Sequence, residues 1–196
     1  MKNKMQEFRL HGRGGQGIVV AAAIFAEAVF LEGYYARAFS LFGAERRGAP
    51  VTAFIRVSPE RMMPRSRIYE PDCVVVLDST LTGSFLIDGL NEKGMLLVNA
   101  GISWDGTLSG EVLAERQFRF FAVDATEIAW QHKLTIGSFP MVNTTMLGAL
   151  AKISGLASLE NLVTSIKKRV TTSIDDNISA AAEGYESVRE VSILVT

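Results

Sequence analysis

Four glycines fall within six positions near the start of the chain, in the run Gly12-Arg13-Gly14-Gly15-Gln16-Gly17. Glycine reaches left-handed backbone angles at little cost, and its missing Cβ lets a ligand approach the main chain. The run matches the pattern G-x-G-x-x-G between a short apolar segment and a long one, as in a strand, turn and helix that present backbone amides. Such amides and the Arg13 guanidinium would stabilise a phosphate or a carboxylate. We therefore predict an anion site here; the alternative is that the glycines only close a tight turn.

Two further groups of residues are candidates for the same site. Arg46 and Arg47 stand between two glycines, in the loop 43–50, and would hold a phosphate or carboxylate in a fork. The alternatives for this pair are ion pairs with Glu45 or an ordinary charged turn. Asn143 and Thr144 begin an expected helix, where the alternative role is to cap it.

A complete NAD-dependent dehydrogenase is the weakest of the functions that the glycine pattern suggests. In an NAD site a carboxylate about twenty residues further on binds the ribose. Glu32 comes too early for that role and Glu45 falls in the next loop. No catalytic acid or base is evident either, since we expect His11 to pack beside the glycine run and His132 to act as a cation or cap at a helix end.

The remaining carboxylates at the ends of expected strands are assigned structural roles. Asp78, Asp124 and Glu127 stand at strand ends or helix starts, where capping and interaction with the helix dipole are favoured over catalysis. We therefore predict no catalytic residue in this chain.

Composition excludes several other classes of protein. The chain has 196 residues, a net charge of −1 and 48% hydrophobic residues, and no strongly basic window of the kind that nucleic-acid binding needs. Its one cysteine, Cys73, lies in an apolar run and is expected to be a buried structural thiol. One cysteine and two histidines do not supply an iron–sulfur cluster or a zinc site. With no signal-peptide core and no apolar stretch long enough to cross a bilayer, we expect a soluble cytoplasmic protein.

The elements that must position these residues alternate between strand and helix and then become helical. The pattern predicts one domain, 1–196, of the α/β class: a three-layer α/β/α, Rossmann-like fold with a mostly parallel or mixed sheet and a helical C-terminal third. Gly33 and Gly155 are expected to end helices, and Ser158 to begin one. We expect strands over 8–10, 35–42, 51–57, 73–77, 95–98 and 119–123, and helices over 18–31, 81–90, 125–133, 143–153, 158–168 and 176–188.

Several motifs together resemble the gamma subunit of pyruvate and related 2-oxoacid:ferredoxin oxidoreductases. The likeness runs along most of the chain, and the order and spacing of the motifs are those of the family. The matching segments are 12–17, 43–51 (Gly-Ala-Glu-Arg-Arg-Gly-Ala-Pro-Val), 55–58, 70–72, 77–78, 94–99, 123–129 and 143–150.

The resemblance implies a subunit without redox centres, in a complex that converts a 2-oxoacid and coenzyme A to acyl-CoA and CO2 and reduces ferredoxin. In that family thiamine diphosphate lies between alpha and beta subunits, and iron–sulfur clusters lie in a beta or delta component. The gamma domain is thought to cover the active site and to help hold coenzyme A. The residues that the resemblance assigns to coenzyme A are Gly12, Arg13, Gly14, Gly15, Gln16, Gly17, Arg46, Arg47, Asn143 and Thr144.

The sequence leaves two alternatives open, one for the substrate and one for the function. The segment 45–51 favours pyruvate or 2-ketoisovalerate over indolepyruvate as the substrate of the complex. The alternative function is a free-standing nucleotide-binding or regulatory module, which would bind nucleotide alone. A complex subunit instead predicts exposed apolar surface, around Tyr34, Tyr35, Phe39 and Phe42 or along Met62-Met63.

Overall fold

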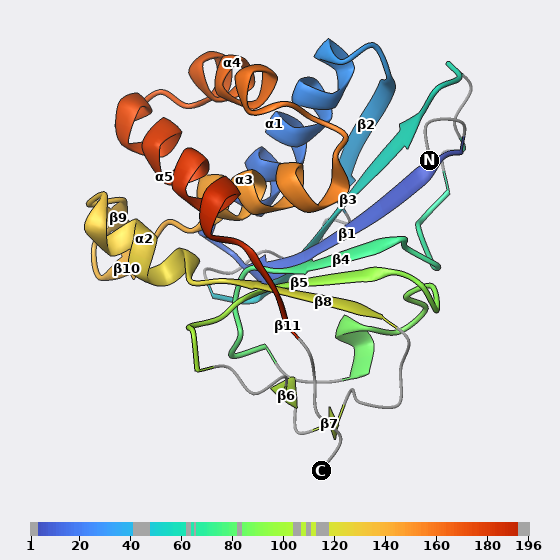
Figure 1. Cartoon of the computed structure of the whole chain (residues 1–196), viewed down its shortest axis with the longest axis horizontal. Coiled ribbons are helices and arrows are strands. Elements are labelled where there is room, and N and C mark those ends of the chain that lie inside the picture. The colour runs from blue at the N-terminus through green and yellow to red at the C-terminus, as the bar shows by residue number, and fades with distance from the viewer. Residues whose placement is uncertain are drawn as a thin grey trace.

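A seven-stranded sheet runs through the middle of the molecule in the order β11-β8-β5-β4-β1-β3-β2 (Figure 1). The computed structural model describes residues 4–40, 48–61, 64, 66–81, 84–103, 107–108, 111–112 and 118–191. The strands of this sheet are β1 (Gln6–Arg13), β2 (Tyr35–Ser40), β3 (Pro50–Ser58), β4 (Cys73–Val76), β5 (Met95–Asn99), β8 (Arg119–Val123) and β11 (Arg189–Val191). Two further hairpins are β6 (Thr107–Leu108) with β7 (Glu111–Val112), and β9 (Thr135–Ile136) with β10 (Phe139–Pro140).

The sheet is mixed, with a parallel centre. β1, β4, β5 and β8 are parallel neighbours, with Leu10 opposite Val75 and Val75 opposite Leu97. β3 runs antiparallel to β1, and β2 runs antiparallel to β3 and hence in the direction of β1. β11 adds an antiparallel edge beside β8. The predicted α/β class and the predicted mostly parallel or mixed sheet are confirmed.

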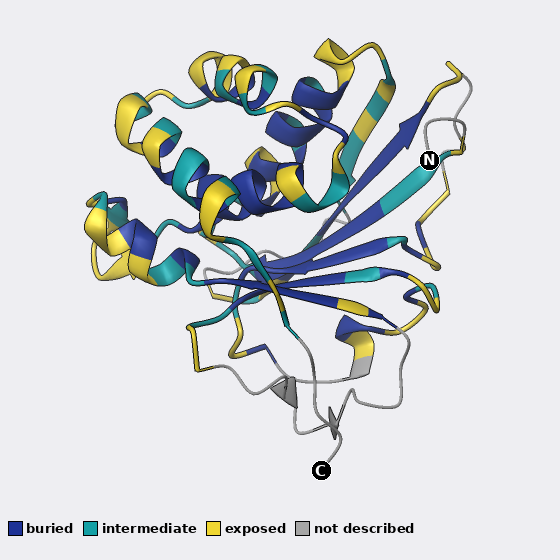
Figure 2. Cartoon of the chain, viewed as in Figure 1, coloured by how far each residue is buried: buried dark blue, intermediate teal, exposed yellow. Residues whose placement is uncertain are grey.

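Helices cover one face of the sheet (Figure 1). They are α1 (Ile18–Leu31), α2 (Ala125–Gln131), α3 (Asn143–Ser154), α4 (Leu159–Arg169) and α5 (Ile174–Ser187). The side of α1, α3 and α5 that faces the sheet is buried (Figure 2), and Phe8, Leu10 and Phe25 belong to this main core. The helical C-terminal third is therefore confirmed. No helix in the described ranges is long and apolar enough to cross a bilayer.

The opposite face is packed differently from the prediction. The other set of side chains on the central strands, among them Val74, Val76 and Leu96, packs against the segment that links β4 to β5. The helix predicted over 81–90 is wrong: this segment holds a single 3-10 turn, η1 (Ser84–Leu86), and its residues 82–83 lie outside the described part. Gly89 contributes to the difference, because its φ of +72° interrupts a right-handed helix and a Cβ there would lie 2.0 Å from the Tyr69 carbonyl oxygen.

The predicted helix ends are largely confirmed. Gly33 follows α1 with a φ of +92°, and Gly155 is the left-handed C-cap of α3. Ser158 caps α4 by accepting a hydrogen bond from the Asn161 amide. Asp124 caps α2 in the same way, through the Glu127 amide. The Asp124 cap fixes where α2 starts at the carboxyl end of β8, on the edge where α/β sheets bind ligands.

Candidate functional site

The glycine run forms the turn between β1 and α1, as predicted. Gly15 and Gly17 have left-handed φ values of 98° and 70°. Two backbone hydrogen bonds join the turn to the residues just before β3. The Gly14 amide donates to the Ala49 carbonyl (2.8 Å), and the Gly48 amide donates to the Gly14 carbonyl (3.0 Å). The amides of Gly15 and Gly17 donate to none of the described residues. Two of the bare amides are thus left for a ligand.

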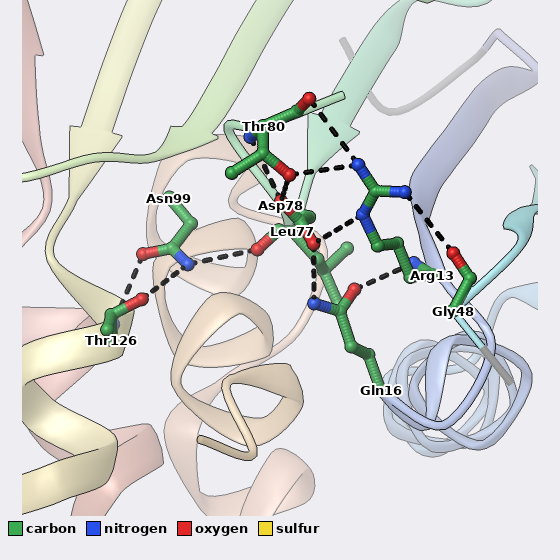
Figure 3. A network of polar contacts seen from close by, with 8 residues as sticks. All are labelled: Arg13, Gln16, Gly48, Leu77, Asp78, Thr80, Asn99 and Thr126. Atoms are coloured by element: carbon green, nitrogen blue, oxygen red, sulfur yellow. Dashed lines mark hydrogen bonds and ion pairs between the residues drawn. The ribbon is translucent and has the colours of Figure 1, made fainter. Parts of the chain in front are cut away.

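Arg13 is held by the protein itself and is not a free cation (Figure 3). Its Nε pairs with Asp78 Oδ2 at 3.1 Å, and its two terminal nitrogens donate to the Gly48 carbonyl (3.2 Å) and to Thr80 Oγ1 (3.0 Å). The guanidinium therefore joins three segments that are far apart in sequence. A ligand here meets a positioned donor whose charge is already balanced.

Asp78 is the centre of this network and was missed as a site residue, because its place after a strand suggested only a cap. Besides Arg13, its carboxylate accepts from Gln16 Nε2 (3.0 Å) and from the Thr80 amide and hydroxyl (2.9 and 2.6 Å). Gln16 closes the ring by accepting from the Arg13 amide at 2.7 Å. A signal was available in the fold prediction, since the end of β4 lies beside the end of β1 once these strands pair in parallel.

Asn99 supports the same edge of the sheet from the next strand (Figure 3). Its Nδ2 donates to the Leu77 carbonyl (2.9 Å) and to Thr126 Oγ1 (3.0 Å), and its Oδ1 accepts from the Thr126 amide (3.2 Å). Asn99 is buried, so these bonds fix the end of β4 against the start of α2.

A cavity of about 760 Å³ opens in front of the glycine turn. The turn and the Asp78 network form one wall, and the β9–β10 hairpin forms the other with Ile136 and Phe139, which are 52% and 63% exposed. This hairpin was not predicted, although Gly137-Ser138 between apolar residues is a two-residue hairpin signal. The lining residues are Arg13, Gly14, Gly15, Gln16, Gly48, Asp78, Thr80, Ile136, Gly137, Ser138, Phe139, Pro140 and Met141.

The start of α1 opens on a second, smaller cavity of about 250 Å³. Gly17 and Asn143 both line it, and the Asn143 amide nitrogen lies 2.6 Å from the position that a Cβ on Gly17 would take. The structure thus brings Asn143 to the glycine turn. Thr144 points elsewhere: it is fully buried, and its hydroxyl donates to Asn177 on α5 at 2.9 Å.

Of the remaining candidate residues, three lie in the described part of the chain and two lie outside it. His11 is buried beside the turn, as expected, and burial lowers its pKa to about 3. His132 ends α2 and contacts Glu183, and Cys73 is buried, which raises the pKa of its thiol. Arg46 and Arg47 lie outside the described residues.

Only part of the apolar surface predicted for contact with other subunits lies in the described residues. Tyr35 is 39% exposed, whereas Tyr34 is half-buried and Phe39 stacks on Phe54. Phe42, Met62 and Met63 lie outside the described residues. Exposed apolar side chains also stand elsewhere, on α1 at Phe30 and on the β9–β10 hairpin.

Comparison with known proteins gives consistent results. The family model described as pyruvate ferredoxin/flavodoxin oxidoreductase matches residues 7–187. A pyruvate/ketoisovalerate oxidoreductases common subunit gamma of Pyrococcus abyssi is 45% identical over 187 residues, covering 94% of this chain and 98% of the relative. A pyruvate synthase subunit PorC of Methanothermobacter marburgensis is 43% identical, with 94% and 98% covered.

Solved structures show the same relationship at the level of the fold. The crystal structure of the pyruvate oxidoreductase subunit PORC of Thermotoga maritima superposes with a TM-score of 0.81 at 36% identity, covering 97% of this chain and all of that one. A 2-oxoglutarate:ferredoxin oxidoreductase of Magnetococcus marinus, solved with 2-oxoglutarate, coenzyme A and succinyl-CoA, shares the fold with a TM-score of 0.71 at 19% identity, and the match covers 94% of this chain and 31% of that one. The chain therefore belongs to the pyruvate ferredoxin/flavodoxin oxidoreductase family, among the gamma subunits of its pyruvate/ketoisovalerate members.

Proposed function

We propose that, in the assembled oxidoreductase, this subunit covers the active site and helps to hold coenzyme A in the larger cavity. The observation that carries the proposal is the position of this cavity, at the carboxyl edge of the parallel strands and directly in front of the glycine turn. Ligands of open α/β sheets bind at this edge. The complex converts a 2-oxoacid, pyruvate or 2-ketoisovalerate, and coenzyme A to acyl-CoA and CO2, with ferredoxin as electron acceptor.

The two walls of the cavity suit different parts of coenzyme A. The glycine turn offers the Gly15 amide and a fixed Arg13 donor, which favour polar or anionic groups of the ligand. The hairpin wall offers Ile136, Phe139 and Pro140, which favour its apolar parts. Because Asp78 already balances the charge of Arg13, we infer that this cavity selects the ligand by shape and hydrogen bonds more than by net charge.

The proposal includes a division of labour with the other subunits. Among the described residues no group of three or more His, Cys, Asp or Glu side chains is placed to bind a metal ion. We propose that thiamine diphosphate, which supplies the decarboxylation chemistry, and the iron–sulfur clusters are bound by alpha and beta subunits, and by a delta subunit where the complex has one. The contribution of this chain is to position coenzyme A for acyl transfer and to exclude water from that step.

Steady-state kinetics of the assembled complex tests the proposal. Ser138→Trp places a large side chain in the cavity from an exposed hairpin position, and Ser179→Trp is the matched control on an exposed position of α5. We expect Ser138→Trp to raise the KM for coenzyme A about tenfold, equivalent to about 1.4 kcal/mol of binding free energy, and to leave the KM for the 2-oxoacid unchanged. Equal KM values for coenzyme A in the two variants would contradict the proposal.

A further inference from the structure

The smaller cavity differs from the larger one in its charge. Its charged lining residues are Lys133 and Arg169, and no acidic residue lines it. Arg169 pairs with Glu27 from the side, whereas the Lys133 ammonium makes no ion pair with any described residue. The larger cavity, by contrast, holds the balanced Arg13–Asp78 pair. The net positive charge is therefore concentrated in the smaller cavity.

The N-terminus of α1 adds to this positive potential. α1 has 14 residues, no acidic residue in its first turn and no side-chain cap on its first amides. Gly17 and Val20, which flank these amides, line the smaller cavity. Aligned peptide dipoles make an uncapped helix start attractive to an anion. The start of α5 also borders the cavity, but Asp175 and Asp176 in its first turn already compensate it.

A buried side chain completes the arrangement. Asn143 is 93% buried, since its relative exposure is 7%, and its Oδ1 accepts from the Thr144 amide. Its Nδ2, which lies against Gly17 at the cavity, donates to none of the described residues. The Asn177 side chain, which also lines the cavity, is fully engaged with Thr144, Thr172 and Ser173. The hydrogens of this Nδ2 are therefore available to a ligand or to water in the cavity.

We propose that the smaller cavity is a second anion site, which binds a phosphate monoester between the start of α1, the Asn143 Nδ2 and the Lys133 ammonium. Lys133, which lines this cavity, has a left-handed φ of 55°, a conformation rare for a residue with a side chain. The two cavities share Ile136 and Met141 as lining residues. The phosphate has two possible sources: a separate phosphorylated metabolite, or the 3′-phosphate of a coenzyme A whose body lies in the larger cavity, which rests on the proposed function.

Titration of the full chain with inorganic phosphate, at constant ionic strength, tests the site itself. We expect saturable binding that is at least about tenfold weaker in Lys133→Gln and is lost in Asn143→Asp, because the new carboxylate repels the anion. Lys93→Gln, which removes an exposed lysine elsewhere, should bind phosphate as the unchanged chain does. Unsaturable binding, or the same affinity in Lys133→Gln and Lys93→Gln, would overturn the proposal.

A comparison of coenzyme A with dephospho-coenzyme A on the assembled complex then identifies the source. If the 3′-phosphate occupies the site, the unchanged complex prefers coenzyme A by about tenfold and Lys133→Gln loses that preference. If a separate metabolite occupies it, Lys133→Gln weakens phosphate binding and leaves the affinity ratio of the two coenzymes unchanged. An unchanged KM for coenzyme A in Ser138→Trp would refute coenzyme A binding in the larger cavity. It would not alter the phosphate titration, so each proposal can be refuted without the other.

Discussion

Arg13 Nε and Asp78 Oδ2 form an ion pair of 3.1 Å that joins the carboxyl ends of two neighbouring parallel strands, β1 and β4. Because the same carboxylate also accepts from Gln16 and Thr80, it holds the glycine turn in place. We expect Asp78→Asn to lower the free energy of unfolding by about 1–3 kcal/mol and to raise the KM for coenzyme A while kcat is retained. A double-mutant cycle with Arg13→Gln, measured by urea unfolding, should give a coupling energy above about 0.5 kcal/mol. Strict additivity would show that the pair does not stabilise the turn.

Gly17 provides a second test, because two separate effects exclude a side chain there. Its φ of +70° strains any other residue, and a Cβ would lie 2.6 Å from the Asn143 amide nitrogen. We expect Gly17→Ala to be clearly more destabilising than Gly33→Ala, which costs about 1–2 kcal/mol from the left-handed backbone alone since open space surrounds Gly33. Urea unfolding measures both variants. Equal losses would mean that Asn143 moves aside freely and does not pack closely on the turn.

His11 makes the stability of the fold depend on acidity. It is buried, its Nε2 has no hydrogen-bond partner among the described residues, and burial lowers its pKa to about 3, with Arg9 adding to the shift. Between about pH 6.5 and pH 3 the unfolded chain binds a proton on this ring and the folded chain does not. The free energy of unfolding should therefore fall as the pH falls through this window, by up to about 1.4 kcal/mol per pH unit.

The His11→Phe variant isolates this contribution. It replaces the imidazole by an apolar ring in a position that contacts Phe85 edge-on, and it should show a flatter pH profile of urea unfolding below pH 6.5. His132→Gln changes the other histidine and keeps His11, so it should retain the steep profile. Identical profiles for His11→Phe and the unchanged chain would show that His11 titrates normally.

Asn99 is predicted to support the site without contacting a ligand. Asn99→Ala leaves the Leu77 carbonyl and the Thr126 amide without partners and should cost about 2–3 kcal/mol of unfolding free energy. Thr126→Val removes only one acceptor of Asn99 and should cost less, on the order of 1 kcal/mol. Thermal or urea unfolding ranks the two variants. The reverse order would mean that the Thr126 hydroxyl, and not Asn99, fixes the end of β4.

Local patterns were sufficient to predict most elements of the fold. α1 begins and ends at the predicted residues because Gly17 and Gly33 allow left-handed turns at both ends of a continuous apolar run. The helix predicted over 81–90 was wrong because the apolar content of this segment suits a helix, whereas tertiary packing brings Gly89 close to the Tyr69 carbonyl. The antiparallel edge strand β11 has only three residues, too few to show a period.

Of the candidate site, the glycine turn was the part best predicted from the sequence. The glycine turn has a sequence signature because its backbone angles restrict the residue type. Asp78 has no such local signature, because an aspartate after a strand looks the same whether it caps a helix or binds an arginine on a neighbouring strand; only the parallel pairing of β1 and β4 indicates its role. Asn143 was a predicted candidate for the site of the glycine run, and it lies beside Gly17 at the second cavity. Lys133 was not a candidate, because the packing of α2 and α3 brings it to this cavity and no spacing in the sequence indicates that contact.

Hydrogen–deuterium exchange of the assembled complex, with and without coenzyme A, tests the central claim most directly. Coenzyme A should slow the exchange of backbone amides in two segments of this subunit, the glycine turn at 14–16 and the hairpin at 136–139, which line opposite walls of the larger cavity. Protection confined to other subunits, with unchanged exchange in both of these segments at saturating coenzyme A, would contradict the claim.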